Sequence, residues 1–225
     1  MISDLELGRI FVAPIKEALN KTFLLGLSSN QRIINVTPGF VVLGKNQKKY
    51  IISHSDLPQA NAILMNSHFQ PLSPFALYKT TDASVKLSVY QVINNTLEEF
   101  PLYPKELHEG MKVFSIGPHM MPDFSYFEKN HVMLGNFINL SLGAADGIIS
   151  KLDGQYKGRA YIQHTVGMVG AINDFGPLFT IQAQKPYLIG LNQNFTYMDA
   201  DDPTYIGISF ACTLKTINDL IEEVS

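Results

Sequence analysis

The sequence predicts an all-β fold, built as barrels or as a sandwich. Three observations predict it. Short runs rich in β-branched and aromatic residues recur along the chain, turn residues separate them, and 46% of the 225 residues are hydrophobic whereas 16% are charged. Many short strands at such spacing are typical of β-barrels and sandwiches. A chain of this length buries a sizeable core, in one large β domain or in two small ones.

The first 22 residues predict an arm that contains a short helix. Apolar residues recur in it at a rough helical spacing: Leu5, Ile10, Ala13, Ile15, Ala18 and Leu19. Pro14 interrupts this pattern. Proline inside a helix removes one hydrogen bond and clashes with the preceding turn, so we expect the helix to be short.

The rest of the chain predicts strands and then one more helix. The strand-like runs cover residues 23–27, 39–44, 49–53, 62–65, 75–79, 86–92, 112–117, 146–152, 161–166, 177–182, 187–192 and 206–212. A helix is predicted over residues 213–225, because its apolar residues share one face. These residues are Leu214, Ile217, Leu220 and Ile221. Thr213 or Thr216 is placed to cap this helix.

The composition excludes some classes of function. The net charge is -3, and Lys and Arg are scattered apart from a loose group at Lys45, Lys48 and Lys49, so we expect no nucleic-acid binding. Cys212 is the single cysteine, which excludes an internal disulfide framework. Its apolar neighbours indicate a structural thiol. We expect no cofactor.

The sequence gives no sign of a transmembrane segment or a signal peptide. No apolar run reaches the roughly 18 residues that span a bilayer, and membrane association stays open. The first residues lack the basic and continuous apolar regions of a signal peptide. We therefore expect no export by that route if Met1 is native, and export, for example to a periplasm, if a leader precedes it.

Seven segments, in this order, resemble the HtrA/DegP-type trypsin-like serine proteases. They are YIISHSDLP (50–58), SVKLSVYQV (84–92), EGMKVFSIG (109–117), DGIISKL (146–152), INDFGPLF (172–179), YLIGLN (187–192) and YIGISFACTLKTINDLI (205–221). The resemblance covers about residues 39–223, and its C-terminal half is the more specific part.

The resemblance implies a chymotrypsin-like fold of two β-barrels with six strands each. The first barrel is expected over residues 23–95, a linker over 96–108, the second barrel over 109–212 and the C-terminal helix over 213–225. Because the chain ends at this helix, we expect no PDZ domain. The resemblance also implies a homo-oligomer, a trimer that assembles through the N-terminal arm.

The resemblance places the catalytic triad on residues that cannot perform its chemistry. The histidine position falls on Asp56, with His54 two residues earlier, the aspartate position on Lys86 and the nucleophile position on Asp174. The mechanism needs a hydroxyl attacker, an imidazole base and a carboxylate that orients the base. We therefore expect a catalytically inactive member of the family, a pseudoprotease.

The loop that forms the oxyanion hole in the family is altered as well. Its residues are Ile172, Asn173 and Asp174, and Phe175 stands at a neighbouring glycine position. A β-branched residue such as Ile172 resists positive φ, which opposes the turn that aims the backbone N–H inward. The negative charge of Asp174 would occupy the donors and repel a developing oxyanion.

Two other interpretations of these positions remain. Asp56 and Asp174 either pair with Lys86 in an ionic cluster, which we favour, or join His54 in a rebuilt metal or acid–base hydrolase site. The other histidines show no metal-ligand spacing and are interpreted as loop or core residues. They are His68, His108, His119, His131 and His164.

The expected partner is a polypeptide or protein, with a regulatory or scaffold role. By family resemblance, a polypeptide adds as a strand along residues 207–211, through backbone hydrogen bonds. These residues are Gly207, Ile208, Ser209, Phe210 and Ala211. The family has only a short loop where this chain has an insertion, between Gly117 and Gly147. The insertion contains Met120, Met121, Phe124, Tyr126 and Phe127. These side chains form an interaction loop, or they cover the barrel.

Overall fold

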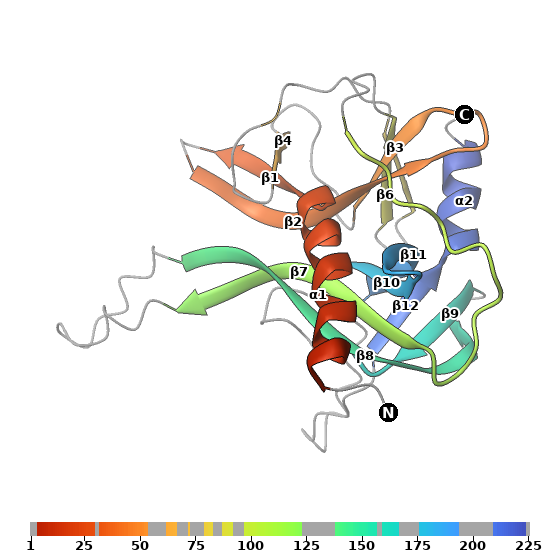
Figure 1. Cartoon of the computed structure of the whole chain (residues 1–225). Helices are drawn as coiled ribbons and strands as arrows, with labels where there is room; N and C mark the ends of the chain where they lie inside the picture. Colours follow the sequence, from red (N-terminus) through yellow and green to blue (C-terminus); the bar gives the residue numbers. More distant parts are fainter. Residues whose placement is uncertain are drawn as a thin grey trace, which may run out of the picture.

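The computed structural model describes residues 4–29, 32–53, 62–66, 72, 79–82, 87–91, 97–122, 138–156, 159–166, 176–193 and 209–223. Over these residues the fold is all-β, with one helix before the strands and one after them (Figure 1). The predicted all-β class is therefore confirmed. No helix among these residues is long and apolar enough to cross a membrane.

The N-terminal helix is longer than its sequence pattern predicted. Helix α1 (Asp4–Lys21) has 18 residues and continues through Pro14. Pro14 and Ala18 are buried, and the helix contacts strands β8 and β11, given below. Burial of this face therefore outweighs the poor helix propensity of proline. The helix ends at Lys21, and the backbone N and Oγ1 of the next residue, Thr22, both donate to the carbonyl oxygen of Ala18, at 3.0 and 2.8 Å.

The first sheet has six strands and follows α1. Its antiparallel neighbours lie in the order β4-β1-β2-β3-β6-β5. The strands are β1 (Phe23–Ser29), β2 (Arg32–Leu43), β3 (Lys49–Ser53), β4 (Ala62–Met65), β5 (Lys79–Asp82) and β6 (Leu87–Gln91). Of the strand predicted over 75–79, only Lys79 is described, and β5 begins there.

The remaining six strands form a closed barrel, and α2 (Leu214–Glu223) follows it. Their order around the barrel is β10-β11-β12-β9-β8-β7. They are β7 (Lys112–Pro122), β8 (Ile138–Tyr156), β9 (Arg159–His164), β10 (Pro177–Gln182), β11 (Lys185–Gln193) and β12 (Ser209–Thr213). Ile217, Leu220 and Ile221 of α2 are buried, as the predicted apolar face requires.

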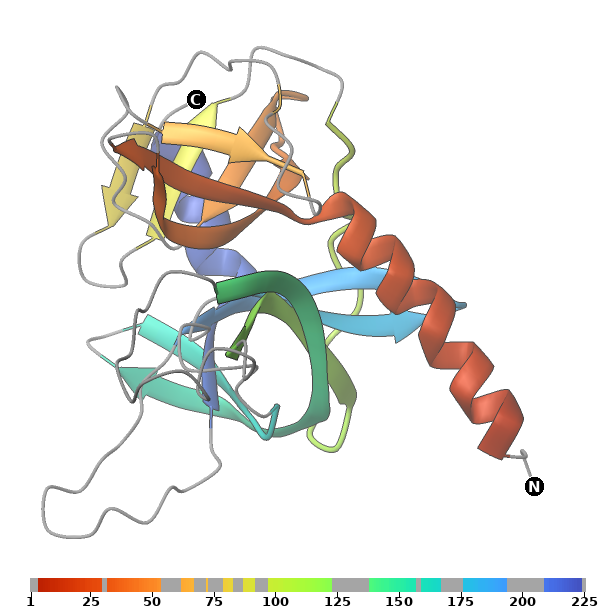
Figure 2. The ribbon, with the colours of Figure 1, turned by 90° about the vertical axis from the view of Figure 1, so that its left-hand side faces the viewer.

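One core joins the sheet, the barrel and both helices. Figure 2 shows the sheet above and the barrel below, with the segment before β7 running between them. This segment bridges to both, because Phe100 N donates to the Val41 carbonyl and Leu188 N donates to the Pro101 carbonyl, each at 2.9 Å. Phe179 of the INDFGPLF stretch lies inside this core, with its ring centroid 4.7 Å from Phe100 and 5.1 Å from Phe114.

Strands β7 and β8 extend beyond the barrel as a two-stranded arm. We call residues 116–122 of β7 and 138–144 of β8 the β7–β8 arm; it projects to the left in Figure 1. The pairing runs without a register shift from Lys112 opposite Ile148 to Pro122 opposite Ile138. Part of the insertion between Gly117 and Gly147 is therefore a continuation of two barrel strands.

Candidate functional site

All residues of the predicted degenerate site lie outside the described part of the chain. This holds for His54, Asp56, Lys86, Ile172, Asn173, Asp174 and Phe175. Their roles and their mutual distances therefore stay predictions. The structure does describe the residues on both sides of 167–175, the segment that carries Asp174.

The second half of INDFGPLF is fixed inside the barrel. Gly176 accepts a hydrogen bond from Asn192 N at 2.8 Å, and β10 begins at the next residue. A Cβ on Gly176 would overlap the carbonyl oxygen of Ile116, so this position requires glycine. Leu178 then pairs with Ser115 of β7 and Gly190 of β11. The prediction that residues 177–179 start a barrel strand is confirmed.

A buried polar group lies beside this strand start, formed by Ser115, His164 and Asn192. They come from β7, β9 and β11, so the closed barrel brings them together. Asn192 Nδ2 donates to Ser115 Oγ at 3.1 Å, and Val166 N donates to His164 Nδ1 at 3.2 Å. His164 Nε2 and Asn192 Oδ1 are buried and have no hydrogen-bond partner among the described residues.

His164 is neutral near neutral pH. Burial lowers the pKa of its imidazole from 6.5 to about 4, although the Asn192 side chain and the backbone of Phe210 act in the opposite direction. Because Nδ1 accepts a hydrogen bond, the proton of the neutral ring is on Nε2. The sequence indicated a loop or core histidine, and His164 is a core histidine with 0% exposure.

This polar group is unsuited to nucleophilic catalysis. Asn192 donates to the Ser115 hydroxyl, and asparagine is not a base that removes a proton. Ser115 and His164 are both buried, so a substrate would not reach them from solvent. The residues Ser115 and Asn192 had no signal in the sequence, because they are 77 positions apart and meet only in the barrel.

Two residues of the predicted peptide-binding strand, Phe210 and Ala211, are paired on both sides. Phe210 and Ala211 of β12 pair with Gln193 and Asn192 of β11. The same two residues pair with β9 on the other side, and Ser209 pairs with His164. An added polypeptide strand would therefore use the residues of this prediction that precede Phe210. Of these, Gly207 and Ile208 lie outside the described residues.

The predicted interaction loop is described only at its beginning. Met120 and Met121 belong to β7, where they pair with Leu140 and Asn139 of β8. Phe124, Tyr126 and Phe127 lie outside the described residues. The backbone of the two methionines is thus part of the β7–β8 arm.

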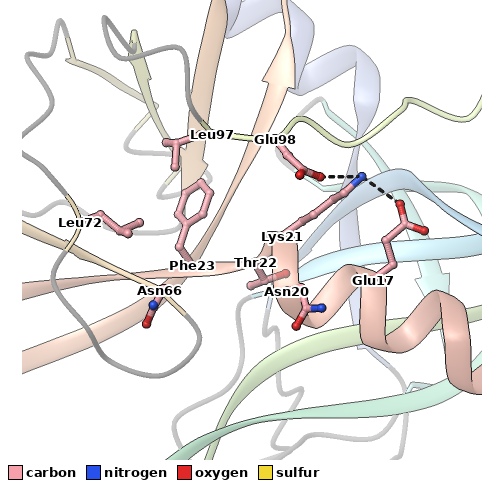
Figure 3. A pocket seen from close by; sticks show the side chains of 9 residues that line it. All are labelled: Glu17, Asn20, Lys21, Thr22, Phe23, Asn66, Leu72, Leu97 and Glu98. Carbon is pink, nitrogen blue, oxygen red and sulfur yellow. Dashed lines mark hydrogen bonds and ion pairs between the residues drawn. The ribbon is translucent and has the colours of Figure 1, made fainter.

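A pocket of about 390 Å³ lies where the end of α1 meets the first sheet (Figure 3). It is lined by Glu17, Asn20, Lys21, Thr22, Phe23, Asn66, Leu72, Leu97 and Glu98. Lys21 Nζ lies 2.9 Å from Glu17 Oε1 and 3.4 Å from Glu98 Oε2. Burial lowers the pKa of Lys21, but the two carboxylates outweigh it and raise this pKa above its usual value.

The charged residues that line this pocket pair with one another, which indicates a structural role for them. Lys21 stays protonated near neutral pH, so it is not a nucleophile, and its charge is already balanced by Glu17 and Glu98. Glu17 belongs to α1, whereas Glu98 belongs to the segment between the sheet and the barrel. Lys21 therefore ties the helix to that segment, and the pocket shows no unpaired cation for an anionic ligand among the residues that line it.

The part of the chain that the structure describes holds no group of three or more His, Cys, Asp or Glu side chains that could bind a metal ion. The weak candidates His54, Asp56 and Asp174 lie outside it. In the comparisons with known proteins, no family model and no curated protein matches the chain.

Proposed function

We propose that the chain has a chymotrypsin-like double barrel and binds polypeptide without cleaving it. In this proposal the first sheet and the closed barrel are the two halves of the fold. The support is the ordered resemblance to HtrA/DegP-type proteases, together with an architecture that is compatible with it: six strands, a closed barrel of six strands and a final helix.

The observation that carries the proposal is the contrast between the two halves of INDFGPLF. Gly176 and Phe179 are held by the barrel and by the shared core, so the second half keeps a structural role. The first half has Asp174 where the family has its serine. A carboxylate in that position does not form the usual acyl-enzyme, because an anhydride with it would be short-lived.

The surroundings of the site also favour a non-catalytic role. His164 shortly precedes the motif, but it is fully buried and its lowered pKa makes the ring a weak base. The family's base position is Asp56, and its orienting carboxylate is replaced by Lys86. A base, a nucleophile and an orienting group are thus all replaced, and a single substitution is not expected to restore cleavage.

Binding is proposed to use the backbone of the residues that precede β12. Strand addition uses main-chain hydrogen bonds, which need neither a serine nor a histidine. Gly207 and Ile208 are the predicted residues for this contact, since Phe210 and Ala211 already pair with β9 and β11.

Binding can be measured by the fluorescence anisotropy of labelled β-casein, a largely unfolded polypeptide. We expect saturable binding, and an affinity about three- to tenfold weaker for Ile208→Pro, which removes one backbone donor. Ile208→Val keeps the donor and serves as the matched control. Absence of binding by the wild-type chain would contradict the proposal, and equal affinities of the two variants would contradict the proposed binding strand.

A further inference from the structure

Three hydrogen bonds, two between backbone groups and one to the Thr165 hydroxyl, show which residues of the β7–β8 arm face its free edges. Ile149 N donates to the Met111 carbonyl at 2.9 Å. The odd-numbered residues Met111 and Ile149 therefore direct these backbone groups toward each other. On β8, Ile148 N donates to Thr165 Oγ1 and its carbonyl accepts from Thr165 N, both at 3.0 Å. Because this alternation has a period of two and the register does not shift, even-numbered residues direct their backbone groups away from the partner strand.

The two outer edges of the arm therefore differ. On β7 the outward positions are Ile116, Pro118, Met120 and Pro122, and the two prolines have no N–H to offer. On β8 the outward positions are Ile138, Leu140, Leu142 and Ala144, all of which have an N–H and a carbonyl. Proline is a common means of blocking an edge strand, so β7 is the blocked edge and β8 the open one.

No described strand pairs with this open edge. Strand β9 pairs with β8 only from Ile149 onward, and β10 pairs with β7 only over residues 113–115. The edge is also uncharged, since residues 138–144 contain no Lys, Arg, Asp or Glu. Charged residues commonly protect exposed edges from pairing, and this edge lacks them.

The arm has an apolar face by register. Cross-strand partners share a face, so Ala144 of β8 lies on the same face as Ile116 of β7, and Leu142 follows two residues away on that face. At the base of the arm this face belongs to the protein core, because Ile116 is buried and Leu142 packs against the same cluster. A two-stranded ribbon alone is only marginally stable, and three or more strands with a hydrophobic face are needed for independent stability.

We infer that the β8 edge of the arm pairs with the same edge of a second copy of this chain. With a two-fold axis at Ser141, antiparallel pairing places Ile138 opposite Ala144 and Leu140 opposite Leu142 of the second copy. Each of these four residues directs its backbone N–H and carbonyl away from β7. All of these groups therefore find hydrogen-bond partners on the second copy. The pairing places no like charges opposite each other, and apolar positions meet apolar positions.

The resulting sheet explains why the two edges differ. Its strand order is β7-β8-β8-β7, so the open edges meet at the centre and the proline-containing strands are outermost. The apolar faces of both arms then lie on one side of a four-stranded sheet. A second copy fits better than an unrelated segment, because its uncharged edge matches this register residue by residue. This inference does not depend on the proposed polypeptide binding.

The test is the mass of the full chain in solution, by light scattering after size-exclusion chromatography over about 1 to 100 µM. We expect twice the monomer mass of 25.1 kDa at the upper concentrations. Leu140→Pro removes an N–H from the open edge and should raise the dimer Kd at least about tenfold. Met120→Pro is the matched control, because Met120 is the cross-strand partner of Leu140 and faces the blocked edge.

A monomeric wild-type chain over this range would overturn the inference, as would the trimer that the family resemblance implies, or equal effects of the two proline variants. A monomer that binds another polypeptide through this edge would also overturn it. Should either variant fail to fold by circular dichroism, hydrogen exchange of the wild-type chain decides. The amides of Leu140 and Leu142 should be protected at high concentration and exchange faster on dilution, and protection that does not change would count against the dimer.

Discussion

Replacing Phe179 by alanine should lower the free energy of unfolding by about 3–5 kcal/mol. Phe179 is fully buried and lies between Phe100 of the connecting segment and Phe114 of β7. Its removal leaves a cavity at the junction of the sheet and the barrel, where both halves contribute to one core. The measurement is urea unfolding at constant temperature, with the midpoint and slope compared between variant and wild type.

Phe179→Leu is the matched control, because it keeps most of the apolar volume and should cost less than about 1.5 kcal/mol if the core repacks. A loss below about 1 kcal/mol for Phe179→Ala would contradict the structural role assigned to the second half of INDFGPLF. Aromatic contacts of this geometry contribute beyond the buried area, so the two variants should be clearly separated.

His164 should make the chain less stable as the pH falls from about 6.5 to about 4, by about 3 kcal/mol in total. Burial lowers the folded-state pKa, so the unfolded chain takes up this proton first. Stability is therefore complete above the ordinary pKa of 6.5 and falls with pH until the folded ring is protonated near 4. Below that value both states carry the proton and the loss becomes constant.

The contribution of His164 is isolated by comparison with His164→Gln, which keeps a hydrogen-bonding side chain but does not titrate. Urea unfolding of both chains at several pH values gives the difference in their pH dependence. We expect the wild type to lose about 3 kcal/mol more than His164→Gln between pH 6.5 and 4. Parallel curves would contradict the burial of a neutral imidazole in the barrel.

The sequence predicted most elements because their hydrophobic pattern is local. The runs at 49–53, 62–65 and 177–182 match β3, β4 and β10 in their bounds. Helix α1 was underestimated, because Pro14 is disfavoured locally and its burial against the barrel is a tertiary effect. Strand β8 begins at Ile138, eight residues before the predicted run, because pairing with β7 extends it.

The polar group beside the start of β10 could not be predicted in the same way. Ser115, His164 and Asn192 look like ordinary strand residues, and they meet because barrel closure brings β7, β9 and β11 together. The free edge of β8 was missed for a similar reason, since it depends on which backbone groups face outward. The replacements at Asp56, Lys86 and Asp174 came from the family pattern and stay predictions.

Cleavage of labelled casein by the purified chain, at about pH 7, tests the central claim most directly. The proposal predicts that release of labelled fragments by the wild type, by Asp174→Ala and by Asp174→Ser equals that of a blank without protein. Asp174→Ser is expected to stay inactive because the resemblance places Asp56 and Lys86 at the positions of the base and its orienting carboxylate. Cleavage by the wild-type chain that disappears in Asp174→Ala would contradict a non-catalytic function.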